Sequence, residues 1–531
     1  MDLILSNVRI PVEKDGMDEY LKAASQKLNI SENNIELVKM LNKSLDASDK
    51  KQFYYEITIV VHTPDSFDNK ENLPEYTETR AAYRKSKNRN SKQRPIIIGF
   101  GPAGMFAALE LIDRGIKPLI FERGKKIEER SVDVKRFINE RVLDPESNIQ
   151  FGEGGAGSYS DGKLFSRVNN SDYANRVLDT FIKFGAPEEI GYIRKPHVGT
   201  DVLCRIVSNI RSHILERGGE IQYSSKMTDM LITEGKVLGV AINGEKEYLA
   251  SSIYLAIGNS SRDTFEMLRK KGIALEQKPL AVGVRVEHPV ETINLIRYGN
   301  KYRGFPGIGA ATYSFTHTNR KTGRGVYSFC MCPGGEVINA SSENGLMVVN
   351  GMSYSSRSSA FSNSAIVVTC HTDDYTSASP LAGIEFQKDI ERKTFTAAGG
   401  SWKAPAQNLV DFLSGRVSGD LNKSSYKMGA VAVNMNEILP AFVYEALVTA
   451  FTAWKEEYPL FVSDDGIVLG AETRTSCPVR IKRSEKYESV AVKNLYPIGE
   501  GSGYTGGITS SAIDAIKAVE VSLGNYLYRY Q

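Results

Sequence analysis

The sequence predicts an α/β protein in three parts: a small α+β module, an α/β domain assembled from separated segments, and a mixed α/β insertion. Three observations support this prediction. Patterns for a strand, a glycine-rich turn, a helix and a second strand follow one another from residue 94. A buried strand that leads into glycines recurs near residues 256 and 499. The stretch between them, from about 281 to 480, has less regular punctuation and many β-like runs.

Residues 1–62 are predicted to form the α+β module. Apolar residues alternate from Leu3 to Val12 as on a strand, and they recur at helical spacing from Met17 to Leu28. Two more strands are expected at 35–41 and 53–61. Residues 63–93 follow as a charged linker, acidic first and then basic. The basic run could contact RNA or an acidic partner, but no aromatic stacking residues accompany it, which favours a solvated linker over nucleic-acid binding.

The glycine-rich turn follows a short apolar strand at 95–98 and reads Gly99-Phe100-Gly101-Pro102-Ala103-Gly104. A helical run over 105–114 leads to a second strand that ends on Glu122, 21 residues after Gly101. In a dinucleotide site, Gly99 permits the tight turn, Gly101 lets the backbone approach a pyrophosphate, and Gly104 lets the helix pack against its strand. The helix N-terminus supplies free N–H groups, and Glu122 would accept hydrogen bonds from a ribose. The pattern therefore predicts a Rossmann-like dinucleotide site, without distinguishing NAD from FAD.

Three further glycine-rich segments are candidates for cofactor contact. Successive N–H groups of FGEGGAGSYSDGK at 151–163 can cradle an anion or cofactor. AIGNSSRD at 256–263 is a strand end that turns into a helix, either as an ordinary turn or as a cofactor contact. GEGSGYTGGI at 499–508 gives a second helix N-terminus, which could stabilise negative charge on a reduced cofactor. Glu500 at its strand tip could bind a sugar-alcohol hydroxyl.

Composition excludes several classes of protein. With 531 residues the chain should form about three domains, and 41% hydrophobic residues, 24% charged residues and a net charge of +3 are those of an ordinary soluble protein. The start lacks the basic and apolar regions of a secretory signal. The most apolar helical stretch, 438–454, carries Glu445 and is short for a membrane span, so we expect a buried helix. The expected compartment is the cytoplasm.

Cysteines and histidines support neither a disulfide scaffold nor a metal site. The five cysteines are far apart except for Cys330 and Cys332, and the absence of CxxC and CxxxxC argues against a dithiol-relay disulfide reductase. The Cys-x-Cys segment FCMCPGG at 329–335 could be a redox couple, but two buried packing cysteines are commoner and are the favoured interpretation. None of the six histidines has metal-ligand spacing.

Taken together, these segments resemble a known family. The resemblance is carried by IIIGFGPAGMFAALELIDRG, FERG, FGEGGAGSYSDGKL, YLAIGNSSRD, GVRVEHP, FCMCPGGEVINASSENG, NGMSYSSR, ETRTSCPVRI and LYPIGEGSGYTGGI. They are similar to the bacterial FAD-dependent dehydrogenases, often labelled NAD(FAD)-utilising dehydrogenases, over essentially the whole chain. The resemblance implies non-covalent FAD and an FAD-binding fold of the glutathione-reductase type with an inserted second domain. We therefore expect the FAD-binding domain at 94–280 plus 481–531 and an inserted substrate domain at 281–480.

The resemblance also implies roles for individual residues. Gly99, Gly101, Pro102, Ala103 and Gly104 would face the pyrophosphate, and Glu122 with Arg123 would face the ribose. The flavin side would be lined by Gly154, Gly155, Ser160, Asp161 and Lys163, with Gly258 as a further contact. The ribityl and isoalloxazine groups would be closed over by Gly499, Glu500, Gly506, Gly507 and Ile508.

Candidate catalytic residues are a weaker inference. Arg285, Glu287 and His288 lie together in GVRVEHP, and Arg474 and Cys477 lie in ETRTSCP. A histidine titrates near neutral pH, so His288 could move protons beside a flavin, although a structural histidine fits equally well. The sequence thus predicts an FAD-dependent oxidoreductase of a small organic substrate, with NADH or NADPH open as electron donor or acceptor because no second GxGxxG is assigned to a nicotinamide cofactor. The alternatives are a flavin-dependent RNA-modifying enzyme and an FAD-binding protein without turnover.

Overall fold

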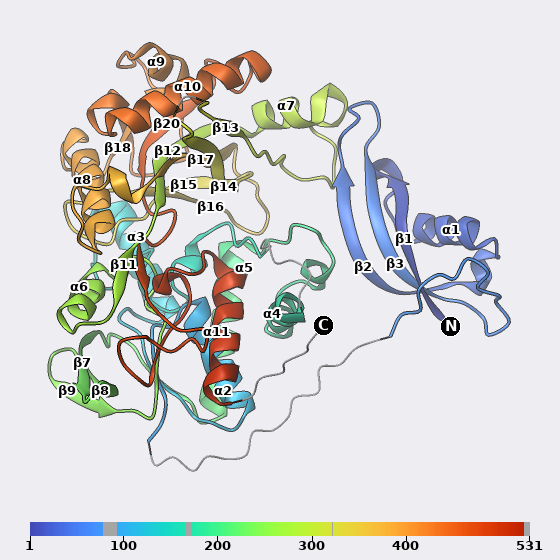
Figure 1. Cartoon of the computed structure of the whole chain (residues 1–531). Coiled ribbons are helices and arrows are strands. Elements are labelled where there is room, and N and C mark those ends of the chain that lie inside the picture. The colour runs from blue at the N-terminus through green and yellow to red at the C-terminus, as the bar shows by residue number, and fades with distance from the viewer. Residues whose placement is uncertain (78–92, 165–171, 321, 525–531) are drawn as a thin grey trace.

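The computed structural model describes residues 1–77, 93–164, 172–320 and 322–524, and its sheets and helices confirm the predicted α/β class (Figure 1). The basic part of the predicted linker, from Arg80 to Lys92, lies outside these ranges. Across the described ranges, every helix is too short or too polar to cross a lipid bilayer.

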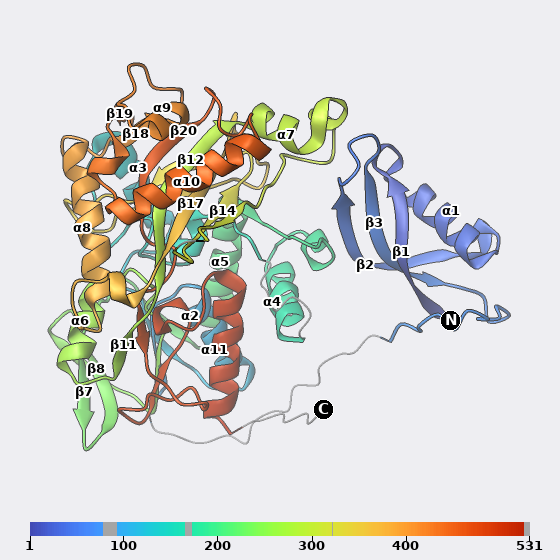
Figure 2. The ribbon, with the colours of Figure 1, turned by 45° about the horizontal axis from the view of Figure 1, so that its top comes forward.

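The N-terminal module is a three-stranded antiparallel sheet with one helix on its face. Its elements are β1 (Asp2–Pro11), α1 (Met17–Leu28), β2 (Glu36–Asp46) and β3 (Tyr54–His62), in the sheet order β1-β3-β2. Tyr20, Ala24 and Leu28 of α1 are buried against the apolar side of the strands, and both views show α1 on the side away from the rest of the chain (Figures 1 and 2). The start of the predicted linker instead follows β1, because Ile4 and Tyr76 donate backbone hydrogen bonds to Pro74 and Asp2 at 2.8 Å.

The module contacts the rest of the chain through an aromatic stack. The rings of Phe53 and Tyr302 lie 4.1 Å apart and nearly parallel. Tyr302 belongs to α7 (Val290–Tyr302) and also donates a hydrogen bond to Glu13 at 2.6 Å. Both Phe53 and Tyr302 are fully buried, so this contact excludes water and fixes the module against α7.

The central sheet is parallel and has the order β22-β10-β4-β5-β6. Its strands are β4 (Ile96–Ile98), β5 (Leu119–Phe121), β6 (Glu220–Gln222), β10 (Ile253–Leu255) and β22 (Leu495–Pro497). Ile97, Ile120 and Tyr254 face a helical layer that consists of α2 (Pro102–Asp113), α4 (Asp172–Lys183), α5 (Gly199–Glu216) and α11 (Ile508–Ser522). Alternate residues of the same strands face the opposite layer, as the period of two requires.

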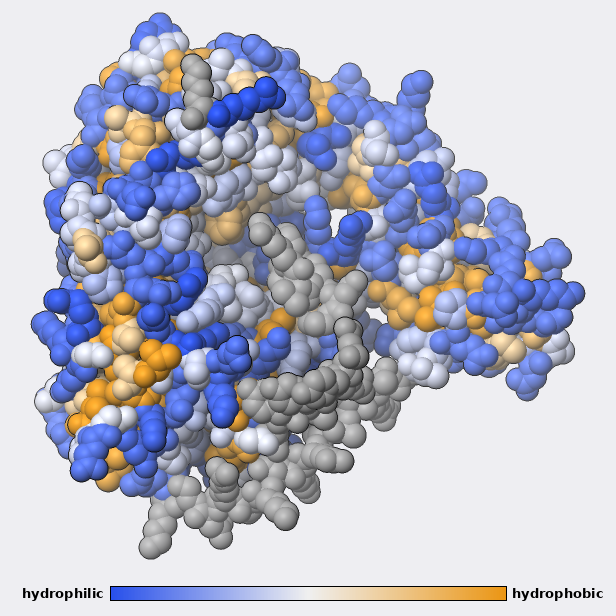
Figure 3. All heavy atoms as spheres, viewed as in Figure 1, coloured by the Kyte–Doolittle hydropathy of each residue, from blue (hydrophilic) through white to orange (hydrophobic). Residues whose placement is uncertain are grey.

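That opposite layer is a small antiparallel sheet together with α6 (Arg262–Lys270). The sheet has the order β7-β8-β9 and comprises β7 (Met227–Thr233), β8 (Lys236–Ile242) and β9 (Lys246–Leu249). Hydrophobic residues gather on the surface over it in Figure 3. Leu238 of β8 and Leu249 of β9 are exposed. Alternating residues at 220–223, 226–233 and 237–242 predict the strands of one small antiparallel sheet. The prediction for 220–223 is wrong, because β6 pairs in parallel with β5 at the edge of the central sheet. The chain reaches β6 through α5, and such a crossover returns a strand parallel to its neighbour.

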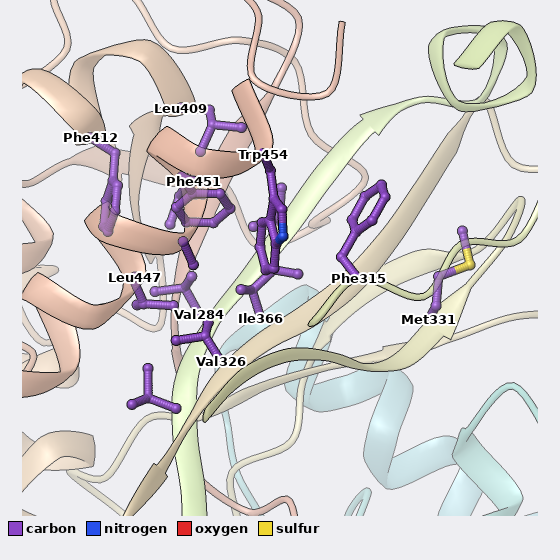
Figure 4. Close-up of a cluster of buried hydrophobic side chains, with 14 of the residues drawn as sticks. Val284, Phe315, Val326, Met331, Ile366, Leu409, Phe412, Leu447, Phe451 and Trp454 are labelled. Carbon is purple, nitrogen blue, oxygen red and sulfur yellow. The ribbon is translucent and has the colours of Figure 1, made fainter. Parts of the chain in front are cut away.

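The predicted insertion contains a seven-stranded mixed sheet with the order β13-β14-β17-β12-β20-β18-β19. Its strands are β12 (Leu280–Pro289), β13 (Thr316–Thr318), β14 (Gly325–Cys332), β17 (Phe361–Cys370), β18 (Ala404–Asn408), β19 (Ala430–Ala432) and β20 (Ile467–Glu472). One face is covered by α9 (Leu409–Ser414) and α10 (Ala441–Glu457), the buried helix expected at 438–454. Figure 4 shows Val284, Val326 and Ile366 of the sheet beneath Phe451 and Trp454.

The other face of this sheet lies toward the central sheet and carries a hairpin of β15 (Glu336–Asn339) and β16 (Val349–Met352). We call the part with the central sheet and the part with the seven-stranded sheet the two halves of the molecule. They are also linked by α3 (Ile127–Glu140), α8 (Ala382–Ala397) and the strand pair β11 (Leu275–Gln277) and β21 (Val479–Ile481). Candidate site residues from both halves can therefore meet between the sheets.

Candidate functional site

One pocket lies at the carboxyl ends of β4, β5, β10 and β22. The residues that directly follow these strands line it, and the space amounts to about 1570 Å³, part of it open to solvent. Parallel strands present their carboxyl ends at one edge of a sheet, so segments that are some 400 residues apart in sequence meet there. Of the predicted cofactor residues, the pocket is lined by Gly99, Gly101, Pro102, Ala103, Glu122, Arg123, Gly155, Ser160, Asp161, Lys163, Gly258, Glu500, Gly507 and Ile508.

Four predicted residues are not among those that line the pocket: Gly104, Gly154, Gly499 and Gly506. A Cβ on Gly104 would lie 2.0 Å from the carbonyl oxygen of Gly99, which fits the close helix–strand packing expected of that position. A Cβ on Gly499 would lie 2.6 Å from the Cβ of Ala103. Gly154 donates its N–H to the Phe100 carbonyl at 2.8 Å, which attaches the 151–163 loop to the glycine turn.

The N-termini of α2 and α11 both open on the pocket. Gly99 has a φ of +95°, and a Cβ there would lie 2.3 Å from the Ala256 carbonyl oxygen, so the turn requires glycine. No side chain caps α2 or α11, and Gly101 and Gly507 at their N-caps line the pocket. The first-turn N–H groups of a helix have no intrahelical acceptor. The pocket therefore has two sets of free donors and two positive dipole ends, which suit a diphosphate and a reducible ring.

Glu122 joins three of the segments that line the pocket. One carboxylate oxygen accepts from the N–H of Phe100 at 2.8 Å, and the other accepts from Gly124 and Gly152 at 2.9 and 3.0 Å. A carboxylate can accept about four hydrogen bonds, so one acceptor position is left for a hydroxyl on the pocket side.

The 151–163 loop is held in shape by Arg130, a residue that sequence reasoning missed. Its guanidinium is fully buried and donates to the carbonyls of Asn148, Ile149, Glu153 and Gly155 at 2.7–3.0 Å. Burial lowers the pKa of Arg130. Nothing in the sequence distinguishes it from the surface arginines of an amphipathic helix, because its partners are backbone atoms.

Asp161 and Lys163 form a buried charged cluster at the far end of the pocket. Lys163 pairs with Asp161 at 2.9 Å, and Arg357 and Ser353 also bond to Asp161. Burial works against the charged carboxylate, but Lys163 and Arg357 outweigh it and lower the pKa of Asp161. Lys163 also donates to the Met331 carbonyl, so the cluster reaches β14.

The candidate catalytic residues of β12 do not meet at the pocket. Arg285 and Glu287 point to one face of the sheet and His288 to the other, as alternation along a strand requires. Arg285 donates to Glu472 at 2.9 Å and to the Cys330 carbonyl at 2.8 Å, and Glu287 accepts from Ser425. His288 is fully buried in the opposite layer, where its Nε2 bonds to the Phe461 carbonyl at 2.7 Å. None of the three is among the residues that line the pocket, so their placement favours structural roles.

Of the two other sequence candidates, one lines the pocket and the other does not. Arg474 lines the pocket and donates to Glu391 at 2.9 and 3.1 Å and to Ser342 at 2.7 Å. Cys477 is buried behind it, beside the Gly501 carbonyl. Cys330 lines the pocket, whereas Cys332 is buried beneath it. Within the described ranges, no three His, Cys, Asp or Glu side chains gather where a metal ion could be held.

The chain is similar to one protein family and to individual known proteins. A family described as "FAD-dependent protein, C-terminal domain-like" matches residues 279–475. A Clostridium beijerinckii protein, described only as an uncharacterized protein, is 41% identical over 529 residues, which make up 98% of each chain. The thiamine thiazole synthase of Pyrococcus horikoshii is 27% identical over 175 residues, 32% of this chain and 56% of that one.

Solved structures with a similar arrangement are more distant. The glycerol-3-phosphate dehydrogenase from Bacillus halodurans complexed with FAD is 12% identical, covers 82% of this chain and 66% of its own, and has a TM-score of 0.35. CtdE in complex with FAD is also 12% identical, covers 81% of this chain and 84% of its own, and has a TM-score of 0.33.

Proposed function

This chain belongs to the family of FAD-dependent proteins, and we propose that it is an oxidoreductase that holds FAD non-covalently and acts on a small organic substrate. The observation that carries the proposal is the convergence of two uncapped helix N-termini and the Glu122 carboxylate on one pocket. A dinucleotide presents a diphosphate, ribose hydroxyls and a ring that gains negative charge on reduction. Each of these groups has a matching partner in this pocket.

Different residues of the pocket would bind different groups of FAD. The N–H groups at the start of α2 would hold the pyrophosphate, and the free acceptor position of Glu122 would take a ribose hydroxyl. Gly101 leaves room for close approach, because a Cβ there would meet nothing nearer than the Cα of Gly155, at an ordinary 3.6 Å. Glu500, held by Asn259 at 2.8 Å, would orient a hydroxyl of the ribityl chain. FAD, when bound, supplies two-electron redox chemistry that no protein side chain here provides alone.

The α11 N-terminus and the Asp161–Lys163 cluster would act at the redox end. Gly507, the N-cap of α11, lines the pocket, and an added Cβ there would meet no atom within 4 Å, which leaves the helix N-terminus open toward the pocket. Its dipole would favour negative charge on the reduced ring. Lys163 lines the pocket and is held in place by Asp161, so its ammonium would add to this stabilisation.

The test is to reduce the purified protein. The protein should be yellow and release FAD on denaturation, and anaerobic mixing with NADH or NADPH should bleach the flavin if either is the electron donor. Protein that binds FAD but is bleached by neither would call for a different donor, to be found by a metabolite screen under turnover. Protein that neither carries FAD nor takes it up would overturn the proposal.

A further inference from the structure

We propose, on the basis of the function above, that Cys330 and Cys332 form a reversible dithiol–disulfide couple that exchanges two electrons with FAD in the pocket. In this proposal the pair takes part in electron transfer and does not serve only to fill space in the core. Four features of the structure support it: the bulge that carries the pair, the short spacing between the two cysteines, the cations beside them, and the position of Cys330 on the pocket wall.

The pair lies on an irregularity at the end of β14. Opposite β17, Phe329 pairs with Ala365 and Cys332 with Asn363, so β14 has one extra residue. Cys330 has a φ of +46°, which is uncommon outside glycine. Bulges of this kind re-aim a side chain and are concentrated beside active sites. Here the result is that Cys330 is partly exposed and lines the pocket, while Cys332 is fully buried behind it.

The two cysteines are near neighbours. The Cys332 sulfur lies 3.4 Å from the carbonyl oxygen of Cys330. Even a fully extended strand places residues i and i+2 only about 6.7 Å apart at Cα, within the roughly 7 Å that a disulfide can span. One intervening residue is therefore sufficient, and the absence of CxxC does not exclude a dithiol couple in this fold.

Two cations lie against the pair. Arg285 donates from Nη2 to the Cys330 carbonyl at 2.8 Å and approaches the Cys332 sulfur at 3.5 Å. Lys163 donates to the carbonyl of Met331, the residue between the two cysteines. The hydrogen bond from Cys330, followed by the charges of Lys163 and Arg285, lowers the pKa of Cys332 despite its burial. The thiolate is the reactive form, so this environment activates one member of the pair.

The other three cysteines lack this environment. Burial raises the pKa of Cys204 to about 11 and that of Cys370 and Cys477 to about 12. None of the three lines the pocket. Any thiol chemistry at the cofactor should therefore be confined to Cys330 and Cys332.

The redox step is balanced with FAD alone. Oxidation breaks the two S–H bonds, forms one bond between the Cys330 and Cys332 sulfurs, and releases two electrons and two protons. Oxidised FAD accepts both electrons and both protons and becomes the reduced cofactor. The reverse step breaks the S–S bond, restores both thiols and returns FAD to its oxidised form.

An anaerobic titration with dithionite tests the proposal on the FAD-bound protein after treatment with the thiol oxidant diamide. Wild type should take up four electrons per flavin, two for the disulfide and two for FAD. Cys330→Ser and Cys332→Ser should each take up two, whereas the control Cys204→Ser should take up four. A second readout does not involve the flavin: tryptic cleavage after Arg324 and Arg357 gives a peptide that holds both cysteines and no other. From oxidised wild type, this peptide should be two hydrogens lighter and should resist alkylation.

The outcomes separate this proposal from the function on which it rests. Wild type that binds FAD, takes up only two electrons and keeps both thiols open to alkylation would overturn the couple and leave the flavoprotein assignment intact. Wild type without FAD would overturn both. A lighter peptide together with four-electron uptake would support the couple, even if one serine variant failed to fold.

Discussion

The carboxylate of Glu122 accepts a hydrogen bond from the backbone N–H of Phe100 at 2.8 Å, which ties the end of β5 to the glycine turn after β4. The same side chain accepts from Gly124 and Gly152. Glu122, which the sequence motif predicts to bind a ribose, thus also holds together three of the segments that form the pocket.

Replacing Glu122 with glutamine should therefore affect both folding and cofactor binding. The introduced amide has one acceptor oxygen for three backbone donors, so we expect a loss of about 1–3 kcal/mol in the free energy of unfolding. Loss of the charged acceptor for a ribose hydroxyl should weaken FAD binding by roughly 10–100-fold. Urea unfolding and the recovery of flavin fluorescence on release measure the two effects. Glu140→Gln, which alters an exposed pair with Arg136, is the control and should change stability by less than about 1 kcal/mol. Unchanged FAD affinity in the Glu122→Gln variant would contradict a ribose contact.

Two glycines of the same turn should behave differently when each is replaced by alanine. At Gly104 the added Cβ would lie 2.0 Å from the Gly99 carbonyl oxygen, and the helix would have to move, at a cost of about 1–3 kcal/mol. At Gly101 the nearest atom would be at 3.6 Å, so the fold should be retained while a closely approaching pyrophosphate is displaced. Melting temperature and FAD content should thus separate the two variants. Gly16→Ala has no neighbour within 4 Å and serves as the control. A Gly101→Ala variant with full FAD affinity would argue against pyrophosphate at this turn.

The parts of the fold that could be predicted from sequence are those in which function imposes a local pattern. Glycine at Gly99 and Gly104 is required by backbone atoms that lie within about 2.3 Å of an added Cβ, so the strand–turn–helix unit is visible in the sequence. The buried strands β12 and β17 are long apolar runs, so they are visible among the β-like runs of the stretch from 281 to 480.

The remainder depends on contacts that the sequence does not encode locally. The edge strand β6 is short and has no fully buried residue, so no periodicity shows which sheet it joins. Arg285 and His288 are three residues apart, but the alternation of the strand places them in different layers. The position of Cys330 depends on a bulge, seen as an extra residue in β14 and a positive φ at Cys330, that no glycine in the sequence marks. Such features arise from tertiary packing and need a structure to be found.

Glu391 should be among the residues most important for joining the two halves of the molecule. It is fully buried on α8 and pairs with Arg262 of α6 at 2.7 and 2.8 Å and with Arg474 at 2.9 and 3.1 Å. The two guanidinium groups outweigh burial and hold its pKa far below the usual range. Glu391→Gln would leave two buried cations with only the partly exposed Glu343 as a counter-charge, which should cost about 3–5 kcal/mol. Glu385→Gln on the exposed side of the same helix is the matched control, with an expected change below about 1 kcal/mol. Equal melting temperatures for the two variants would show that the buried pairs contribute little.

The buried histidine of β12 should make the protein sensitive to acid. Burial lowers the pKa of His288 to about 4 from its ordinary 6.5, because the charged ring would lie in an apolar layer against Phe461. Between these two values the unfolded chain binds more protons than the folded one, so the free energy of unfolding falls as the pH falls. A shift of this size corresponds to about 3 kcal/mol, lost progressively from pH 6.5 to pH 4.

His288→Gln should remove this pH dependence, because its side-chain amide stays neutral and can still donate to the Phe461 carbonyl. We expect the variant to be less stable than wild type at pH 7, by about 1–2 kcal/mol for the altered packing, and the gap to close or reverse by pH 4. Urea unfolding across this range measures both slopes. His197, whose pKa burial also lowers to about 4, should leave part of the acid sensitivity in place. Because His288 does not line the pocket, the variant should keep its FAD at pH 7. Loss of turnover with full FAD would instead revive His288 as a proton carrier.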